Sequence, residues 1–578
     1  MKTSSFSVNK KDDISIVLAG AAGQGIETFE NLLISIMKTT GYNVFSTKEY
    51  MSRVRGGINS TEIRVSSKRV AAYIDRIDIL IPLTKDAILH LRKRITTDTI
   101  IVGEQENIEG ALECTDCEVE VPFTDIAVKL GGKIYANIVV IGLIACLLNV
   151  EEGLVEDFLK QRFSSKGEKI VSNNIAAAKK GFELAKELKA DQRIVIGLQK
   201  NPHVRDELLM DGTEAVAMGA IAGGCNFIVG YPMAPATGVL RFLAGEAVEF
   251  DIVVEQIEDE ISGINATIGA WYAGGRGMVT TSGGGFALMS EGLSLAGVTE
   301  TPVVIHLSQR PGPATGLPTR TEQGDLELAL YAGHGFFPRI ILAPGKIDDA
   351  FYLTQDAFNL ADKYQVPVFI LTDNYLVNFY YNFPPLDLTR IKIEHHIVKT
   401  EKDYRRYELT ESGISPRGIP GFGEGLVAAD SHEHDEEGHI SEDLHYMRIK
   451  MVEKRLTKLK LLENDVILPE LIGSETYKIL LIGWGSTFHL IKEAMELLGE
   501  RDISFLHFKQ VYPLYPDLSK YLKKAEKTVI IENNATSQFG KLIKQHTGIE
   551  IDAKILKYNG LPFSVEELVE KLEKIVKL

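Results

Sequence analysis

The sequence predicts an α/β protein of several domains, and three observations support this fold class. Apolar runs of strand length alternate with amphipathic helical stretches near both ends of the chain, and a glycine loop directly follows the first apolar run. Between these regions, residues 211–324 hold 20 of the 51 glycines, separated by further apolar runs. Such alternation is typical of mostly parallel sheets covered by helices. The length of 578 residues suits about three or four domains.

We expect the first domain to span residues 1–190. A buried strand is predicted over 14–20, followed by the loop GAAGQG (20–25) and an amphipathic helix from residue 26. This order opens an α/β unit. Further strands are predicted at 59–67, 78–83 and 99–104, and helices at 84–95, 137–149 and 172–188.

The rest of the chain divides into three predicted parts. Residues 206–385 form a second domain, in which a helix at 211–224 precedes several short apolar strands. Residues 386–470 are charged and contain few apolar runs, so we expect a connecting segment with short helices. Residues 471–578 alternate regularly between strands and helices, which predicts a compact α/β domain with a mostly parallel sheet.

Composition excludes several classes of protein. Hydrophobic residues make up 45% and charged residues 25%, and the net charge is −16, which argues against a nucleic-acid-binding surface. The N-terminal residues lack the apolar core of a signal peptide. The longest apolar run, 138–150, is too short to span a bilayer. We therefore expect a cytoplasmic protein without a membrane partner.

Four cysteines do not form a disulfide framework. Cys114 and Cys117 are spaced as C-x-x-C, but no second pair follows, while Cys146 lies in an apolar run and Cys225 at a strand entrance. We therefore expect no metal centre in this chain. Four histidines (His432, His434, His439 and His445) lie among acidic residues; a solvated loop is the favoured interpretation, and a divalent-cation site is the alternative.

The loop GAAGQG does not match the dinucleotide fingerprint G-x-G-x-x-G. Backbone N–H groups at the start of the following helix are nevertheless suited to an anion. Lys48, Arg53 and Arg55 surround the position of the acidic ribose partner near Glu49, which favours a phosphorylated ligand. The alternative is a tight turn between strand and helix that binds nothing.

The most specific signal is a set of four segments in the glycine-rich block. They are GYPMAP (230–235), VEQIEDEISGINATIGA (254–270), TTSGGGF (280–286) and SQRPGPATGLPTRTEQGD (308–325). In the second segment a strand leads to acidic residues at the start of a small-residue helix. A carboxylate there is able to face a ligand beside the glycines; the alternative is that it only complements the helix dipole.

These segments resemble the thiamine-diphosphate-dependent 2-oxoacid:ferredoxin oxidoreductases. GYPMAP is similar to the family's YPITP loop, and residues 206–385 resemble its pyrimidine-binding domain. Residues 1–190, with GAAGQG and RVRGG (53–57), resemble its gamma domain, and residues 471–578, with IENNATSQFG (531–540), its transketolase-C-terminal-like domain. The chain therefore resembles a fused gamma–alpha subunit.

The resemblance implies a role for several residues in cofactor binding. A glutamate of the alpha subunit hydrogen-bonds N1′ of the aminopyrimidine; by position this is Glu260, with Glu258 as the alternative. Tyr231, Pro232, Gly283 and Gly284 are the other candidates for cofactor binding.

For the substrate, Arg310 matches the family's carboxylate-binding arginine, and Arg320 is the alternative. The threonine of YPITP is replaced by Ala234, so either Thr237 or Thr315 supplies the hydroxyl or the substrate is one that needs no such bond. Gly23, Gln24, Gly25 and Arg55 are candidates for binding coenzyme A.

The resemblance also implies partners and a reaction. A beta subunit would hold the diphosphate, Mg²⁺ and a [4Fe–4S] cluster, and ferredoxin would accept electrons from the oxidative decarboxylation of a 2-oxoacid, such as pyruvate or 2-oxoglutarate, to an acyl-CoA. Four cysteines at these spacings do not provide a cluster site, so we expect the chain to be inactive without this partner, in a dimer of alpha–beta pairs. The alternatives are a divergent member acting on aryl or branched-chain oxoacids, and a non-catalytic α/β nucleotide-binding scaffold.

Overall fold

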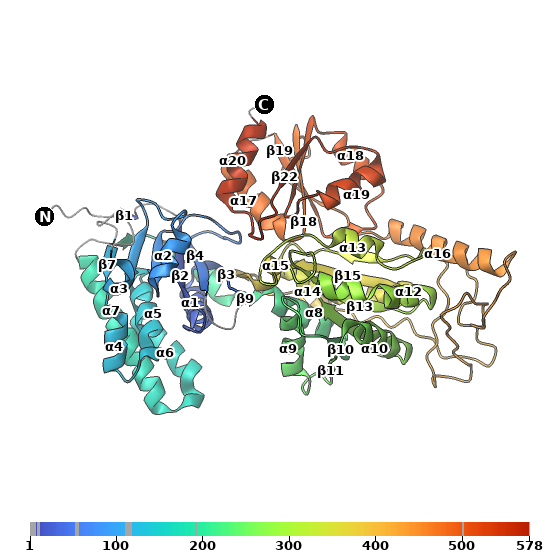
Figure 1. Ribbon diagram of the computed structural model, residues 1–578, viewed down its shortest axis with the longest axis horizontal. Helices are drawn as coiled ribbons and strands as arrows, with labels where there is room; N and C mark the ends of the chain where they lie inside the picture. Colours follow the sequence, from blue (N-terminus) through green and yellow to red (C-terminus); the bar gives the residue numbers. More distant parts are fainter. Residues whose placement is uncertain are drawn as a thin grey trace. The chain divides into compact units, whose positions relative to one another are not determined.

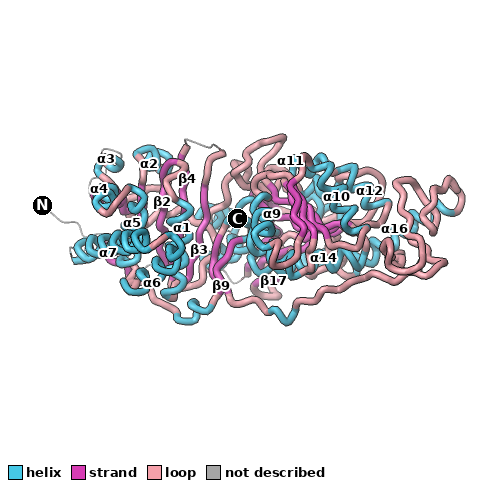
Figure 2. The backbone as a smooth tube through the Cα atoms, turned by 90° about the horizontal axis from the view of Figure 1, so that it is seen from below, coloured by secondary structure: helices cyan, strands magenta, loops and turns pink. Residues whose placement is uncertain are grey.

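The computed structural model describes residues 7–8, 12–52, 57–109, 118–190, 194–499 and 502–576. The chain divides into two compact units. The first unit comprises Met1–Met210 and Phe379–Pro385, and the second comprises Asp211–Asn378 and Leu386–Leu578. Figure 1 shows the helices and strands by label, and Figure 2 shows the strands running between helices.

The first unit is built on an eight-stranded mixed sheet in the order β7-β6-β5-β2-β4-β3-β16-β9. Strand β2 is parallel to β5 and antiparallel to β4. The strands of the sheet are β2 (Asp13–Ala21), β3 (Asn43–Glu49), β4 (Ile58–Ser66), β5 (Ile79–Pro82), β6 (Ile100–Gly103), β7 (Glu118–Glu120), β9 (Leu208–Asp211) and β16 (Tyr380–Phe383). Strands β1 (Ser7–Val8) and β8 (Val195–Ile196) form a separate parallel pair.

Helices cover both faces of this sheet because side chains alternate along β2. Ile14, Ile16 and Leu18 belong to one buried cluster with α1, α5, α6 and α7, whereas Val17 and Ala19 belong to another with α2 and α3. The helices are α1 (Ile26–Thr40), α2 (Lys85–Leu91), α3 (Gln105–Ile108), α4 (Phe123–Lys129), α5 (Ala136–Leu147), α6 (Glu152–Phe163) and α7 (Glu168–Ala190), with short 3₁₀ turns η1 (Lys133–Tyr135), η2 (Ser164–Lys166) and η3 (Pro202–Asp206).

The apolar run near residue 140 forms the buried helix α5, which packs closely on α7. A Cβ atom at Gly142 would lie 2.1 Å from the carbonyl oxygen of Ala178, and one at Gly181 would lie 2.1 Å from that of Val139. Both glycines are therefore required for this backbone approach. Cys146 is buried in the same core, as expected. Among the helices that the structure describes, none is long and apolar enough to cross a membrane.

The second unit contains a seven-stranded sheet in the order β11-β10-β12-β13-β15-β14-β20. All pairs up to β14 are parallel, and β20 is antiparallel to β14. The strands are β10 (Phe227–Gly230), β11 (Val253–Gln256), β12 (Gly277–Thr281), β13 (Val303–Gln309), β14 (Ile340–Leu342), β15 (Pro367–Asp373) and β20 (Gln510–Tyr512). The helices are α8 (Gly212–Ala222), α9 (Thr237–Glu246), α10 (Glu260–Tyr272), α11 (Gly283–Leu288), α12 (Ser290–Val298), α13 (Leu326–Tyr331), α14 (Ile347–Tyr364) and α15 (Asn374–Asn378).

A second sheet of this unit has the order β17-β19-β18-β21-β22 and is parallel except for the edge strand β17. Its strands are β17 (Glu470–Ile472), β18 (Ile479–Trp484), β19 (Ile503–Phe508), β21 (Lys527–Glu532) and β22 (Ala553–Leu556), with η5 (Gly485–Thr487), α17 (Phe488–Leu498), α18 (Leu518–Leu522), α19 (Gln538–Thr547) and α20 (Val565–Val576). One buried cluster contains residues of both sheets, including Ile305 and Trp484. The two sheets therefore share a hydrophobic core.

The segment after residue 386 contains η4 (Leu388–Arg390), a long irregular stretch and α16 (Met447–Asn464). Buried charges attach it to the rest of the unit. The carboxylate of Glu300, in the turn before β13, pairs with Lys454 at 2.5 Å and with Lys458 on α16. Arg406 donates to the backbone carbonyl of Glu300 at 2.8 Å. The segment after residue 386, which has few apolar runs, is thus attached to the rest of the second unit by buried ion pairs and hydrogen bonds.

The histidine cluster is not gathered into one site. His432, His439 and His445 are exposed, in agreement with a solvated acidic loop, whereas His434 is fully buried with its ring 3.8 Å from that of Tyr407. Within the described ranges, no group of three or more His, Cys, Asp or Glu side chains is placed to hold a metal ion. Cys114 and Cys117 lie outside the described residues.

Candidate functional site

The four sequence segments meet at one edge of the seven-stranded sheet. GYPMAP follows β10, the acidic segment follows β11, the three consecutive glycines follow β12 and Arg310 follows β13. These strands are parallel, so their carboxyl ends lie on the same side. This edge is where open α/β sheets bind ligands.

Glu260 is the first residue of α10 and is only 4% exposed, whereas Glu258 is exposed. The neighbouring Asp259 caps the helix by accepting a hydrogen bond from the backbone N–H of Ser262 at 2.8 Å. Burial raises the pKa of the Glu260 carboxyl, and nearby Asp259 raises it further. Of the two candidate glutamates, Glu260 is therefore the one in a sheltered environment that favours a protonated carboxyl.

The glycine turn after β12 lies between two carboxyl groups. A Cβ atom at Gly285 would lie 2.2 Å from Oε1 of Glu260, and one at Gly283 would lie 2.3 Å from Oδ1 of Asp325. Neither position accepts a side chain without displacing a carboxyl group. Gly284, between them, is exposed and has only the carbonyl oxygen of Ala314 nearby, at 3.5 Å.

Arg310 lies at the end of β13 and is 9% exposed. Its Nη1 donates to the backbone carbonyl of Ala234 at 2.5 Å, so the arginine holds the GYPMAP loop by its main chain. Burial lowers the pKa of Arg310, and Asp325 opposes that change. The guanidinium has further donors, which are suited to a carboxylate.

The other candidates occupy different positions around this edge. Tyr231 is 42% exposed, Pro232 and Thr315 are exposed, and Thr237 begins α9. Arg320 packs with its Cβ against Gly560, near the C-terminal sheet domain. Arg320, the alternative to Arg310, therefore packs against a different part of the unit.

Three buried polar atoms around the glycine turn have no hydrogen-bond partner among the described residues: Oε1 of Glu260, Oγ of Ser282 and Oδ2 of Asp325. Unsatisfied buried polar groups are rare in proteins and call for an explanation. A polar heterocycle, such as the aminopyrimidine of thiamine diphosphate, presents the ring nitrogen and amino group that such atoms bind. The residues present therefore fit this cofactor.

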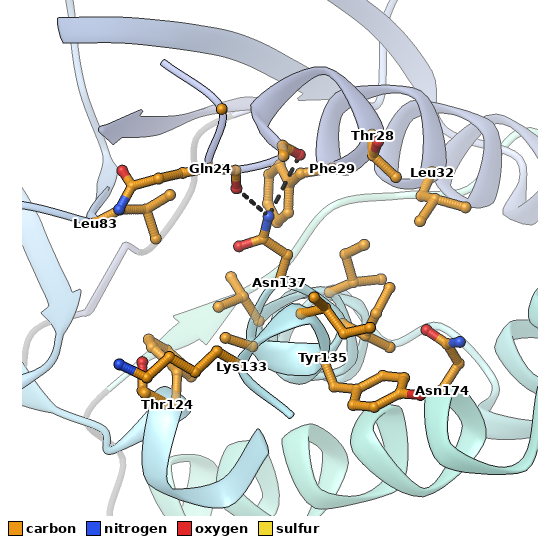
Figure 3. Close-up of a pocket in the computed structure, with 18 of the residues that line it drawn as sticks. Gln24, Thr28, Phe29, Leu32, Leu83, Thr124, Lys133, Tyr135, Asn137 and Asn174 are labelled. Atoms are coloured by element: carbon orange, nitrogen blue, oxygen red, sulfur yellow. Dashed lines mark hydrogen bonds between the residues drawn. The ribbon is translucent and has the colours of Figure 1, made fainter. Parts of the chain in front are cut away.

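The first unit contains a separate pocket of about 750 Å³, lined by the GAAGQG loop, α1, η1 and α5. Figure 3 shows Asn137 reaching from α5 to this loop, where its Nδ2 donates to the carbonyl oxygens of Gln24 (2.8 Å) and Gly25 (3.3 Å). Gly23 and Gly25 have φ angles of 90° and 76°, which favour glycine. Gln24 accepts a hydrogen bond from Ala21 N–H at 2.6 Å.

Polar groups of both signs surround this pocket. Lys133 and Lys166 line it together with Glu104 and Glu106. The predicted residues Gly23, Gln24 and Gly25 are thus brought together at a cavity, whereas Arg55 lies outside the described residues.

Sequence reasoning missed several residues of these sites. Asp325 is only the last residue of the segment 308–325, and Gly285 is only one of the glycines of TTSGGGF. Asn137 and Lys133 lie far in sequence from the glycine loop that they adjoin. The three consecutive glycines were the one local signal, since glycine marks close approach of another group.

Comparison with known proteins agrees with this architecture. The family model described as pyruvate flavodoxin/ferredoxin oxidoreductase, thiamine diphosphate-binding, matches residues 218–454, and that described as pyruvate ferredoxin/flavodoxin oxidoreductase matches residues 15–184. The 2-oxoacid:ferredoxin oxidoreductase subunit alpha of Sulfolobus sp is 32% identical, with 98% of this chain and 97% of the relative covered. The 2-oxoglutarate synthase subunit KorA of Archaeoglobus fulgidus is 34% identical and covers 63% of this chain and 98% of its own.

A solved structure extends the agreement to three dimensions. The 2-oxoglutarate:ferredoxin oxidoreductase of Magnetococcus marinus, solved with 2-oxoglutarate, coenzyme A and succinyl-CoA bound, superposes with a TM-score of 0.91 at 31% identity. The match covers 98% of this chain and 100% of that one. The two family models together span the glycine turn after β12 and the GAAGQG loop. The chain therefore belongs to the family of 2-oxoacid:ferredoxin oxidoreductase alpha subunits.

Proposed function

We propose that this chain catalyses, with a beta subunit, the oxidative decarboxylation of a 2-oxoacid with coenzyme A to an acyl-CoA and CO₂, with electrons passing to ferredoxin. The observation that carries the proposal is the buried Oε1 of Glu260, which has no hydrogen-bond partner among the described residues and lies against the glycine turn. A buried carboxyl with a raised pKa is typical of an acid–base group.

Thiamine diphosphate, when bound, supplies the electron sink that allows the carboxylate of a 2-oxoacid to leave as CO₂. Glu260 is proposed to hold a proton between its Oε1 and the pyrimidine N1′. Because Gly283 and Gly285 have no side chains, the carboxyl groups of Asp325 and Glu260 can approach the glycine turn, where the ring is proposed to bind. Tyr231 and Pro232, both exposed at the end of β10, would cover one side of the cofactor.

Arg310 is proposed to bind the carboxylate of the oxoacid. Its contact with the carbonyl of Ala234 orients the guanidinium, and paired N–H donors match a carboxylate geometrically. Ala234 has no hydroxyl for the substrate, so Thr237 or Thr315 would supply one. The same absence favours, as a second candidate, a member acting on bulkier aryl or branched-chain oxoacids.

The remaining components are assigned to partners. We propose that a beta subunit supplies Mg²⁺, the diphosphate site and a [4Fe–4S] cluster, that the complex is a dimer of alpha–beta pairs and that it is cytoplasmic. In support, Cys146 and Cys225 are both buried, and a chain of this length with only four cysteines is typical of a reducing compartment.

The test is viologen reduction by the chain with its beta subunit, thiamine diphosphate, coenzyme A and a panel of oxoacids. We expect activity that requires all of them. Arg310→Ala should raise KM for the oxoacid by about 10-fold or more, the effect of losing a charge-assisted pair, and leave thiamine diphosphate affinity unchanged. Lack of activity on every oxoacid would instead favour a non-catalytic scaffold, and a fall in cofactor affinity would mean that Arg310 is misassigned.

The pocket of the first unit is proposed to bind coenzyme A. Backbone N–H groups at the start of α1 and the ammonium groups of Lys133 and Lys166 would face its phosphates. Gly23, Gln24 and Gly25 form one wall, and Arg55, which precedes β4, is proposed to contribute as well.

A lysine pair variant tests this pocket. Lys133→Ala/Lys166→Ala should raise KM for coenzyme A about 3- to 10-fold, because each exposed charge pair contributes only a fraction of a kcal/mol to about 1 kcal/mol. KM for the oxoacid should not change. Lys129→Ala is the matched control, since Lys129 is an exposed lysine of α4 that does not line the pocket. Equal effects on both substrates would place the lysines in a structural role.

A further inference from the structure

We propose that the segment 531–540 of the five-stranded sheet takes part in cofactor binding, with Gln538 as a positioning residue that fixes the carboxyl group of Asp325 at the glycine turn. The inference rests on the proposed function, because it concerns the place where the aminopyrimidine is proposed to bind. It gives a role to a motif, IENNATSQFG, that lies more than 200 residues from the glycine turn in sequence.

A buried carboxylate fixes the shape of this segment. Glu532, at the end of β21, is fully buried and accepts hydrogen bonds from Oγ of Ser537 at 2.9 Å and from the backbone N–H of Phe539 at 3.0 Å. It also accepts one from Nδ2 of Asn534 at 2.7 Å. Hydrogen bonds to an ionised group are stronger than neutral ones, so the segment 531–540 is held in one conformation.

This segment in turn holds the loop that precedes α13. The backbone N–H of Gln323 donates to the carbonyl of Asn533 at 2.7 Å, and Oε1 of Gln323 accepts from the backbone N–H of Asn533 at 2.9 Å. Nδ2 of Asn534 donates to the carbonyl of Gln323 at 3.1 Å. Gln323 is fully buried, and its Nε2 donates to the carbonyl of Trp484, at the end of β18, at 2.9 Å. These bonds attach the loop to the five-stranded sheet.

Gln538 contacts the main chain on both sides of Asp325. Its Nε2 donates to the carbonyl of Gly324 at 2.7 Å, and its Oε1 accepts from the backbone N–H of Glu327 at 2.9 Å. The backbone N–H of Asp325 itself donates to Oε1 of Gln309, at the end of β13, at 3.0 Å. The main chain at Asp325 is thus fixed between the five-stranded sheet and the strand end of the seven-stranded sheet.

The carboxyl group of Asp325 lies against the glycine turn. A Cβ atom at Gly283 would lie 2.3 Å from its Oδ1 and 2.4 Å from its Oδ2. Asp325 is the N-cap residue of α13, where an aspartate usually accepts a hydrogen bond from the first turn of the helix. In the part of the chain that the structure describes, its side chain makes no such bond, and its buried Oδ2 has no hydrogen-bond partner. The carboxyl group is therefore positioned to accept a hydrogen bond from a polar heterocycle bound at this turn.

Gln538 acts on the cofactor through this carboxyl group. Without its side-chain amide, the carbonyl of Gly324 and the N–H of Glu327 lose a partner, and the loop is less well ordered before the cofactor binds. Ordering a loop on binding lowers the affinity. The loss should concern the aminopyrimidine alone, because the diphosphate is proposed to be held by the beta subunit.

The experiment measures cofactor binding to the complete complex of this chain and its beta subunit in the presence of Mg²⁺. Gln538→Met keeps an unbranched side chain of similar size and removes both hydrogen bonds. The matched control Gln545→Met removes an exposed hydrogen bond of the same helix, the one that Oη of Tyr331 donates at 2.8 Å. Titration calorimetry uses two probes: thiamine diphosphate, and inorganic pyrophosphate, which lacks the aminopyrimidine.

Gln538→Met should bind thiamine diphosphate about 3- to 10-fold more weakly than the wild type, the effect of losing a neutral hydrogen bond, and should bind pyrophosphate equally well. Asp325→Ala removes the carboxyl group itself and should weaken thiamine diphosphate binding by at least as much, again without an effect on pyrophosphate. In the Asp325→Ala background, Gln538→Met should have no further effect, because the group that it positions is absent. Such non-additivity shows that two residues act together. Gln545→Met should bind both probes as the wild type does.

Failure of this inference and failure of the proposed function give different results. If the wild-type complex does not bind thiamine diphosphate, the proposed function fails and this inference fails with it. If the wild type binds it but Gln538→Met or Asp325→Ala binds it equally well, or if the two substitutions weaken binding additively, only this inference is overturned. Weaker binding of pyrophosphate in Gln538→Met also overturns it, because that result indicates a general structural role.

Discussion

Replacing Glu260 by glutamine should lower turnover by about 10²- to 10⁴-fold, the range for a positioned proton-transfer group. Glutamine keeps the size and one carbonyl oxygen of the side chain, but it cannot exchange a proton with a ring nitrogen. The buried, unpartnered Oε1 and the raised pKa of Glu260 are the reasons for expecting the effect here. Turnover is measured by viologen reduction in the reconstituted complex.

Glu258→Gln is the matched control, because Glu258 is an exposed glutamate two residues earlier. It should retain wild-type turnover. Binding of thiamine diphosphate, followed by the quenching of protein fluorescence, should weaken much less in Glu260→Gln than turnover does. Wild-type turnover in Glu260→Gln, or a large loss in Glu258→Gln, would remove Glu260 from the mechanism.

Replacing Glu300 by glutamine should destabilise the second unit by about 3 kcal/mol or more, the cost of leaving a buried charge without its partner. Glu300, Lys454 and Lys458 have side chains only 1% exposed. In the variant, two buried ammonium groups lose their carboxylate. The expected result is a fall of several degrees in the thermal unfolding midpoint, measured by circular dichroism.

The effect should depend on pH in a defined direction. Despite burial, the two lysines hold the pKa of Glu300 well below its usual value of 4.5. Its contribution to stability is therefore fully present above pH 4.5 and declines as the pH falls toward the folded-state pKa. The difference between the wild type and Glu300→Gln should accordingly shrink below pH 4.5.

Two further variants distinguish a loss of stability caused by unpaired buried charges from a nonspecific effect of substitution. Glu300→Gln/Lys454→Met removes one of the unpaired cations and should recover part of the lost stability. Asp517→Asn breaks an exposed pair with Lys520 and should have little effect, as exposed pairs do. An unfolding midpoint unchanged in Glu300→Gln would contradict the role assigned to the ion-pair cluster.

Local patterns were sufficient for most elements of this fold. The strand, glycine loop and helix from residue 14 correspond to β2 and α1, and the alternation after residue 471 corresponds to β18–α20. These elements follow from short-range periodicity and turn chemistry. By contrast, β16 pairs with β3 across more than 300 residues of sequence. No local sequence pattern encodes this pairing, because it joins strands that are distant in sequence and depends on the edge that β3 offers to β16 in the folded sheet.

For the candidate site, too, part could be predicted from the sequence and part depended on the tertiary structure. The resemblance of the four segments to the family indicated Glu260 and Arg310, and both follow strands whose carboxyl ends lie at the same edge of a parallel sheet. It did not distinguish Glu260 from Glu258, which differ in burial and not in residue type. Nor did it single out Asp325, whose importance depends on a carboxyl packed against Gly283.

The sequence by itself determined the α/β class, the family and the residue types at the site, because these depend on periodicity and on short motifs. Only the tertiary structure decided which carboxyl groups are buried without partners and which lysines share the carboxylate of Glu300. The physical reason is that burial and electrostatic coupling arise between residues far apart in sequence. They are properties of the packed chain and set the pKa of each group only once it has folded.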